Sequence, residues 1–135
     1  MIALDTSVLI AIMLDEAEAD TFKAVLREEP SILIGWPTLF ETRLVLTTKR
    51  FSNPADIVSR FFGAPNVTSV AFDSKHYQAA EQAFERFGKG RHPAGLNMGD
   101  CFSYAVATLA KAPLLFKGRD FSQTDLKLHP ASSTT

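Results

Sequence analysis

Short apolar runs alternate along this chain with longer stretches that have helical spacing. Four runs are typical of buried strands and cover residues 2–4, 31–35, 67–72 and 113–116, with a fifth short strand expected at 127–129. Neighbouring parallel strands need a crossover connection, usually a helix. The alternation therefore predicts an α/β fold in three layers, with a central, mostly parallel sheet of four to five strands and helices on both faces.

The stretches between these runs carry residues that start or stop helices. Asp5, Thr6 and Ser7 offer an N-cap, and prolines follow the boundaries at Trp36 and Asn53. The predicted helices cover residues 8–14, 17–27, 37–50, 54–62, 75–87 and 101–111. Residues 88–95 contain three glycines and a proline and are basic, so we expect an exposed loop there.

Length and composition limit the domain organisation. With 135 residues and 46% hydrophobic content, the chain can form one compact domain, which we place at residues 1–130, followed by a disordered Ser-Thr tail at 131–135. The single cysteine, Cys101, excludes an internal disulfide. The longest apolar stretch, Val8 to Leu14, is too short to span a bilayer. We therefore expect no membrane partner and a cytoplasmic location.

Four acidic residues lie beside apolar runs rather than in charged surface stretches: Asp5, Glu41, Asp100 and Asp120. In parallel α/β sheets, ligands bind outside the carboxyl ends of the strands. Asp5 follows the first strand and Asp120 the fourth, while Glu41 and Asp100 fall in the first turns of helices that begin near the same edge. We expect all four carboxylates to line one crevice.

Converging carboxylates limit the chemistry of such a crevice. Two like charges about 4 Å apart repel by roughly 4 kcal/mol at an effective dielectric near 20, so the four acids must hold protons or recruit cations. Mg²⁺, with Mn²⁺ as a substitute, takes oxygen ligands and activates water for phosphodiester cleavage. The pattern predicts a metal-dependent nuclease in which Asp5, Glu41, Asp100 and Asp120 are both the catalytic and the metal-binding residues.

Structural roles are open for each acid. Asp5 could cap the first helix, Glu41 could be a solvated acid favoured by the helix dipole, and Asp100 could cap its own helix, although Asn97 is available for that. Asp120 could be an ordinary turn residue.

Two other functions also remain open. One is a phosphohydrolase with Asp5 as nucleophile, although Ser7 replaces its usual second aspartate. The other is a non-catalytic RNA- or protein-binding module with the same fold.

Basic and hydroxyl side chains near the acids are candidates for substrate binding. They are Thr6, Ser103, Lys89, Arg91, Lys117 and Arg119. Positive side chains around an acidic floor would position the phosphates of a nucleic acid. A solvated loop is the alternative for Lys89 and Arg91. Apolar residues on the first and third helices exceed what one buried face needs, so some are candidates for a partner contact.

Several segments resemble the PIN-domain ribonucleases and, within them, the VapC toxins of bacterial toxin-antitoxin systems. The matching pieces are Ile2 to Ser7, Trp36 to Glu41, Gly99 to Ala105 and Leu114 to Phe121, in the family's order. The resemblance implies a Mg²⁺-dependent endoribonuclease, usually a homodimer, that is inhibited by a cognate VapB-type antitoxin. It also implies that Asp5, Glu41 and Asp100 are acids of the metal site, with Thr6 as a nearby hydroxyl.

The fourth acid departs from the family's pattern. Many members have it a few residues before the position of Phe121, where this chain has Lys117 and Gly118. Asp120 is the nearest acid, and the sequence predicts that it takes this place.

Overall fold

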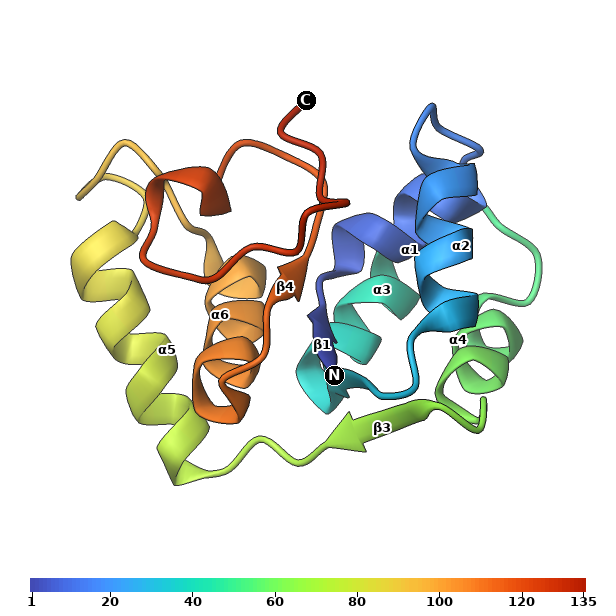
Figure 1. The fold of residues 1–135 in the computed structure, drawn as a ribbon, viewed down its shortest axis with the longest axis horizontal. Coiled ribbons are helices and arrows are strands. Elements are labelled where there is room, and N and C mark those ends of the chain that lie inside the picture. Colours follow the sequence, from blue (N-terminus) through green and yellow to red (C-terminus); the bar gives the residue numbers. More distant parts are fainter.

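The computed structural model describes the whole chain, residues 1–135. It is built on a four-stranded parallel sheet with strand order β3-β2-β1-β4, covered by six α-helices (Figure 1). The strands are β1 (Ile2–Leu4), β2 (Ile32–Gly35), β3 (Val67–Val70) and β4 (Leu114–Leu115). The α-helices are α1 (Thr6–Met13), α2 (Ala19–Glu28), α3 (Trp36–Thr48), α4 (Pro54–Phe62), α5 (Ser74–Phe87) and α6 (Met98–Ala110). The predicted α/β class and layering are confirmed.

Strand β1 lies between β2 and β4, so the start of the chain is the centre of the sheet. Ala3 pairs with Leu33 on one side and with Leu114 on the other. The backbone N–H of Asp5 then donates to the carbonyl of Leu115 at 3.2 Å, which fixes the residue just beyond the strand. All three residues of β1 are buried, as expected for a central parallel strand.

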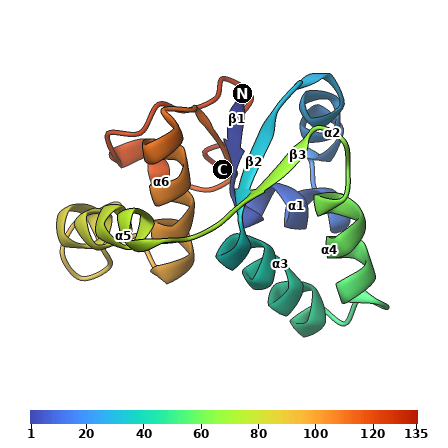
Figure 2. The ribbon, with the colours of Figure 1, turned by 90° about the horizontal axis from the view of Figure 1, so that it is seen from below.

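Side chains alternate between two separate cores, one on each face of the sheet. Ile2 and Leu4 point into a cluster with Phe22, Leu39 and other residues of α1–α4. Ala3 points the other way, into a cluster with α5 and α6. Figure 2 shows α1–α4 on one side of the strands and α5 and α6 on the other. This alternation follows from the two-residue period of a strand.

Several element boundaries differ from the prediction. Helix α6 begins at Met98 rather than Cys101, because the Asn97 side chain caps it by accepting from the N–H of Asp100. Helix α1 begins at Thr6 for the same reason, with Asp5 as its cap. The expected fifth strand is only a single bridge between Leu114 and Leu128. Strand β3 ends at Val70, so residues 71–72 lead directly to α5.

The last residues follow the edge beside β4. The N–H of Ser133 donates to the carbonyl of Phe116 at 3.0 Å, and the N–H of Gly118 donates to the carbonyl of Ser133 at 2.9 Å. The domain limit at residue 130 and the tail at 131–135 stay predictions. No helix has the length and apolar character that crossing a membrane requires.

Candidate active site

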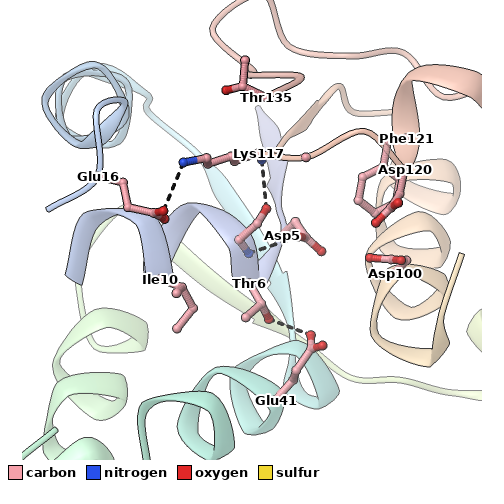
Figure 3. Close-up of a pocket in the computed structure, with 12 residues that line it drawn as sticks. Asp5, Thr6, Ile10, Glu16, Glu41, Asp100, Lys117, Asp120, Phe121 and Thr135 are labelled. Atoms are coloured by element: carbon pink, nitrogen blue, oxygen red, sulfur yellow. Dashed lines mark hydrogen bonds and ion pairs between the residues drawn. The ribbon is translucent and has the colours of Figure 1, made fainter. Parts of the chain in front are cut away.

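The four acids line one pocket at the carboxyl edge of the sheet (Figure 3). The pocket has a volume of about 400 Å³ and a polar lining. The lining residues are Asp5, Thr6, Ser7, Ile10, Glu16, Glu41, Asp100, Lys117, Gly118, Asp120, Phe121 and Thr135. Asp5, Glu41, Asp100 and Asp120 come from four distant segments of the chain, so only the fold brings them together.

Asp5 serves both as a helix cap and as a pocket residue. Its Oδ2 accepts from the N–H of Ser7 at 3.1 Å, which caps α1. Its Oδ1 accepts from the hydroxyl of Ser103, a buried residue one turn after Asp100 on α6, at 2.5 Å. The carboxylate is itself buried, so these two donors fix its orientation. The structural and functional interpretations of Asp5 are therefore compatible.

Glu41 reaches the pocket from the second turn of α3. Its Oε1 accepts from the hydroxyl of Thr6 at 2.7 Å. Burial raises the pKa of the Glu41 carboxyl, and the charge of Asp5 adds to this effect. The buried hydroxyl of Thr42 lies 3.1 Å from the Thr6 Oγ1 and supports it from the next position along α3.

Asp100 belongs to the capping box of α6. Its Oδ2 accepts from the N–H of Asn97 at 3.0 Å, while the Asn97 side chain accepts from the N–H of Asp100 at 2.9 Å. Burial raises the pKa of the Asp100 carboxyl to about 7, against the opposing effect of the Asn97 hydrogen bond, and the charges of Asp5, Asp120 and Glu41 raise it further. Burial and the neighbouring carboxylates thus disfavour the charged form of Asp100 more than the Asn97 hydrogen bond favours it.

Asp120 follows β4 and immediately precedes a short 3₁₀ helix, Phe121–Gln123. Figure 3 shows its side chain beside that of Asp100. Its charge is among the causes of the raised Asp100 pKa, which agrees with that proximity. Lys117 and Gly118, at the positions where many relatives have the fourth acid, line the same pocket.

The basic candidates are divided between two regions. Lys117 lines the pocket, but its Nζ is paired with Glu16 at 3.2 Å and with Glu18 at 3.0 Å. Arg119 is exposed beside Asp120 and forms no ion pair.

Lys89 and Arg91 do not line the pocket. They lie after α5, where the Arg91 guanidinium pairs with Glu85 at 3.2 Å and lies 5.0 Å from the centre of the Phe84 ring.

Sequence reasoning missed the second layer of polar contacts. The Ser7 hydroxyl accepts from the N–H of Lys117 at 2.9 Å and so joins α1 to the end of β4. Glu16 and Glu18, in the turn between α1 and α2, and Thr42, within α3, were also missed, because polar residues at such positions usually face solvent. Ser7, which lies within the Asp-Thr-Ser motif, was the only one with a local signal.

The donor set suits a hard divalent cation. Five carboxylates line the pocket; one of them, Glu16, engages the only cationic lining side chain, Lys117, together with Glu18, which leaves Asp5, Glu41, Asp100 and Asp120 without a cationic partner. As arranged here, no three acidic, histidine or cysteine side chains meet closely enough to hold one ion. Coordination by several of these acids therefore requires side-chain rotation toward the ion.

Comparison with known proteins agrees with this fold and pocket. The PIN-domain family matches residues 2–127. Ribonuclease VapC of Mycolicibacterium smegmatis is 40% identical over 124 residues, which cover 91% of this chain and 95% of that protein. Ribonuclease VapC30 of Mycobacterium tuberculosis is also 40% identical over 124 residues, covering 91% and 94%.

Solved structures show the same fold at lower identity. VapC20 of Mycobacterium tuberculosis, a toxin that cleaves the sarcin-ricin loop, superposes with a TM-score of 0.77 at 19% identity and covers 93% of this chain and 96% of its own. A chain of VapBC2 from Rickettsia felis, bound to a promoter DNA fragment, gives a TM-score of 0.72 at 16% identity, covering 96% and 98%. The extent and identity of the sequence matches show that the chain belongs to the PIN-domain family and, within it, to the VapC ribonucleases.

Proposed function

We propose that this protein is a Mg²⁺-dependent endoribonuclease and the toxin of a VapBC-type toxin-antitoxin system. One observation carries the proposal: Asp5, Glu41, Asp100 and Asp120, from separate segments, line one pocket whose only cationic side chain is already paired with Glu16 and Glu18. PIN-domain nucleases are metal-dependent in general. The choice of Mg²⁺, with Mn²⁺ as a substitute, rests on the all-oxygen donor set.

Each acid has a distinct place in the proposed site. Asp5 and Asp100 would hold the ion from opposite walls, while Glu41 and Asp120 complete the acidic set. Ser103 donates to Asp5, Thr6 to Glu41 and the Asn97 N–H to Asp100, so three of the acids have hydrogen-bond partners that limit the rotation each must make toward an ion. The chemistry that Mg²⁺ would supply at these residues is activation of a water molecule and stabilisation of negative charge on the departing 3′ oxygen of the RNA.

Substrate binding would depend on positive side chains outside the acidic floor. Arg119 is exposed beside Asp120 and unpaired, so it is available for a phosphate. Lys117 would contribute only after partial release from Glu16 and Glu18. Lys89 and Arg91, beyond the pocket on the loop after α5, would contact the RNA further from the cleaved bond. The RNA substrate is part of the proposal.

An apolar groove between α1, α2, α3 and α4 suits a helix of a VapB-type antitoxin. It has a volume of about 330 Å³ and is lined mainly by apolar side chains, among them Leu9, Ile12, Met13 and Phe61. Lys23 and Arg27 stand at the same groove. An amphipathic helix with acidic residues beside its apolar face would complement it in both shape and charge.

A second apolar surface supports the expected homodimer. Trp36, Phe40 and Leu44 form a stripe along α3 with 46%, 62% and 49% of their surfaces exposed, and Met98, the first residue of α6, is 74% exposed. Contiguous exposed apolar side chains of this size are typical of a protein interface. We assign this surface to a second copy of the chain, separate from the proposed antitoxin groove. This leaves the acidic pocket open beside the interface.

The decisive experiment compares Asp100→Asn with a matched surface control. Asp56→Asn makes the same chemical change on the outer face of α4, where Asp56 only pairs with Arg60. We expect Asp100→Asn to fold normally and lose Mg²⁺-dependent cleavage of RNA, whereas Asp56→Asn retains it. EDTA should abolish wild-type cleavage. Unchanged cleavage by Asp100→Asn would contradict the proposed site.

The same measurements separate the other functions. A non-catalytic RNA- or protein-binding module would show neither EDTA-sensitive RNA cleavage nor binding of Mg²⁺ that depends on these carboxylates. A phosphohydrolase would form a covalent phosphate on Asp5, which mass spectrometry detects. A toxin that acts on RNA is expected in the cytoplasm. We also propose that residues 1–130 form its single domain.

A further inference from the structure

Gly99 and Glu41 lie in unusually close contact. Gly99 is the buried second residue of α6, and Glu41 projects toward it from α3. A Cβ added to Gly99 would lie 2.0 Å from Oε2, 2.6 Å from Cδ and 2.8 Å from Oε1 of Glu41. Atoms that are not bonded to each other do not approach this closely. The Glu41 carboxylate therefore occupies the space that any other side chain at position 99 would take.

Backbone conformation does not explain the glycine. The glycines with positive φ are Gly90, Gly95 and Gly118, whereas Gly99 has ordinary helical geometry. In a helix, glycine is less favourable than alanine, because it loses more conformational freedom on folding. Gly99 is unfavourable in a helix and does not need glycine for its φ angle. Its presence is explained by the space that its missing side chain leaves for Glu41.

Glu41 is confined on its other side as well. The Thr6 hydroxyl donates to Oε1 at 2.7 Å, and Thr42 lies behind that hydroxyl. The carboxylate is thus held between α1 and the first turn of α6, next to Asp100. A methyl group on residue 99 would force the flexible end of Glu41 out of this position. The backbone of α6 would not need to move.

We propose that Gly99 is a positioning residue, whose missing side chain lets the Glu41 carboxylate enter the metal pocket between Thr6 and the first turn of α6. This inference rests on the proposed function, since it assigns Glu41 to the ion-binding set. According to this inference, the glycine makes the helix less stable but leaves the room that Glu41 needs in the pocket. A substitution should improve the helix and damage the pocket.

The test is Gly99→Ala, measured first without RNA. By isothermal titration we expect Mg²⁺ and Mn²⁺ to bind the variant at least tenfold more weakly than wild type. The melting temperature of the metal-free variant should equal or exceed that of wild type, because alanine is the better helix former. A wild-type affinity in Gly99→Ala would overturn the inference.

Two further variants show whether Gly99 acts through Glu41. In a Glu41→Ala background, adding Gly99→Ala should change metal affinity less than twofold, because no carboxylate remains to be displaced. In the Gly99→Ala background, Glu41→Asp should recover part of the affinity, because its shorter side chain avoids the new methyl group. An undiminished tenfold effect in the Glu41→Ala background would overturn the inference.

Folding failure is also informative. If Gly99→Ala alone unfolds, the double variant with Glu41→Ala should fold, since the clash is removed, and failure of both to fold would refute the inference. If the proposed function itself is wrong, the wild-type protein will not bind Mg²⁺, and this result is distinct from any effect of Gly99→Ala. In that case, a crystal structure of metal-free Gly99→Ala still decides the inference: Glu41 displaced from Thr6 supports it, and Glu41 unmoved overturns it.

Discussion

The hydroxyl of Ser103 donates a hydrogen bond of 2.5 Å to Oδ1 of Asp5, across 98 positions of the chain. It connects the middle of α6 with the end of the central strand. Because Ser103 is 1% exposed and Asp5 is 6% exposed, water cannot replace this donor without rearrangement. The orientation of a proposed metal ligand thus depends on one buried hydroxyl.

Ser103→Ala should therefore weaken both the fold and the site. A hydrogen bond to a charged group contributes roughly 1.5–3 kcal/mol, so we expect the free energy of unfolding to fall by about 1–3 kcal/mol. Rotation of the freed Asp5 should lower kcat roughly tenfold, which corresponds to about 1.4 kcal/mol. Urea denaturation and cleavage rates measure the two effects. Ser122→Ala, which removes an exposed hydroxyl bonded to the carbonyl of Arg119, is the control and should change neither.

The raised pKa of Asp100 predicts pH-dependent stability and metal binding. With its pKa about 7 in the folded chain against an ordinary 3.8, the native carboxyl stays protonated where the unfolded one is ionised. The folded state binds more protons between these values, so this group lowers stability as pH rises from about 4 to 7. Metal-free Asp100→Asn should thus be more stable than wild type at pH 8, and the difference should vanish near pH 4.

Mg²⁺ must displace the Asp100 proton below pH 7. Its affinity for wild type should therefore rise from pH 6 to pH 8, with proton release seen in calorimetry in buffers of different ionisation enthalpy. A flat profile would contradict the raised pKa.

Arg119 and Lys117 should differ in their contribution to RNA binding. Arg119 is unpaired, whereas Glu16 and Glu18 hold Lys117 and already satisfy its charge. We expect Arg119→Gln to weaken RNA binding more than Lys117→Gln and to reduce the slope of log affinity against log salt by about 1. Binding titrations in EDTA, where cleavage is suppressed, measure this. An equal or larger loss in Lys117→Gln would refute the ranking.

The α3 surface should control oligomeric state. Phe40→Glu and Met98→Glu place charges on side chains that we assign to the dimer contact, so each should yield a monomer in light scattering. Leu109→Glu is the matched control, because Leu109 is an exposed apolar residue at the other end of α6. The assignment of the interface would be contradicted if Phe40→Glu and Met98→Glu both remained dimers, or if only the Leu109→Glu control dissociated.

Much of the architecture was predictable because its signals are local. Capping residues and prolines marked the helices, and short apolar runs marked the strands. The fifth strand was wrong in extent, because the pattern at 127–129 matches a strand but only Leu128 forms a bridge. Strand pairing depends on neighbours that are distant in sequence, and local pattern does not contain them.

The acids were predictable for a different reason. A carboxylate beside an apolar run needs a partner, and this requirement singles out Asp5 and Asp100 from their sequence neighbours alone. The hydroxyl supports were harder to find, since Thr42 is indistinguishable in sequence from a surface threonine. The space left by Gly99 was not detectable at all, because it exists only where α3 and α6 meet.

The pairing of β1 with β4 has a consequence for the timing of synthesis. Leu4 lies beside Leu115, so β1 cannot complete its place in the sheet until the distant segment that forms β4 has been translated. Asp100 and Asp120 likewise emerge late. A chain that ends before Asp100 keeps Asp5 and Glu41 but lacks the other two acids, so such a fragment could not assemble the proposed metal site.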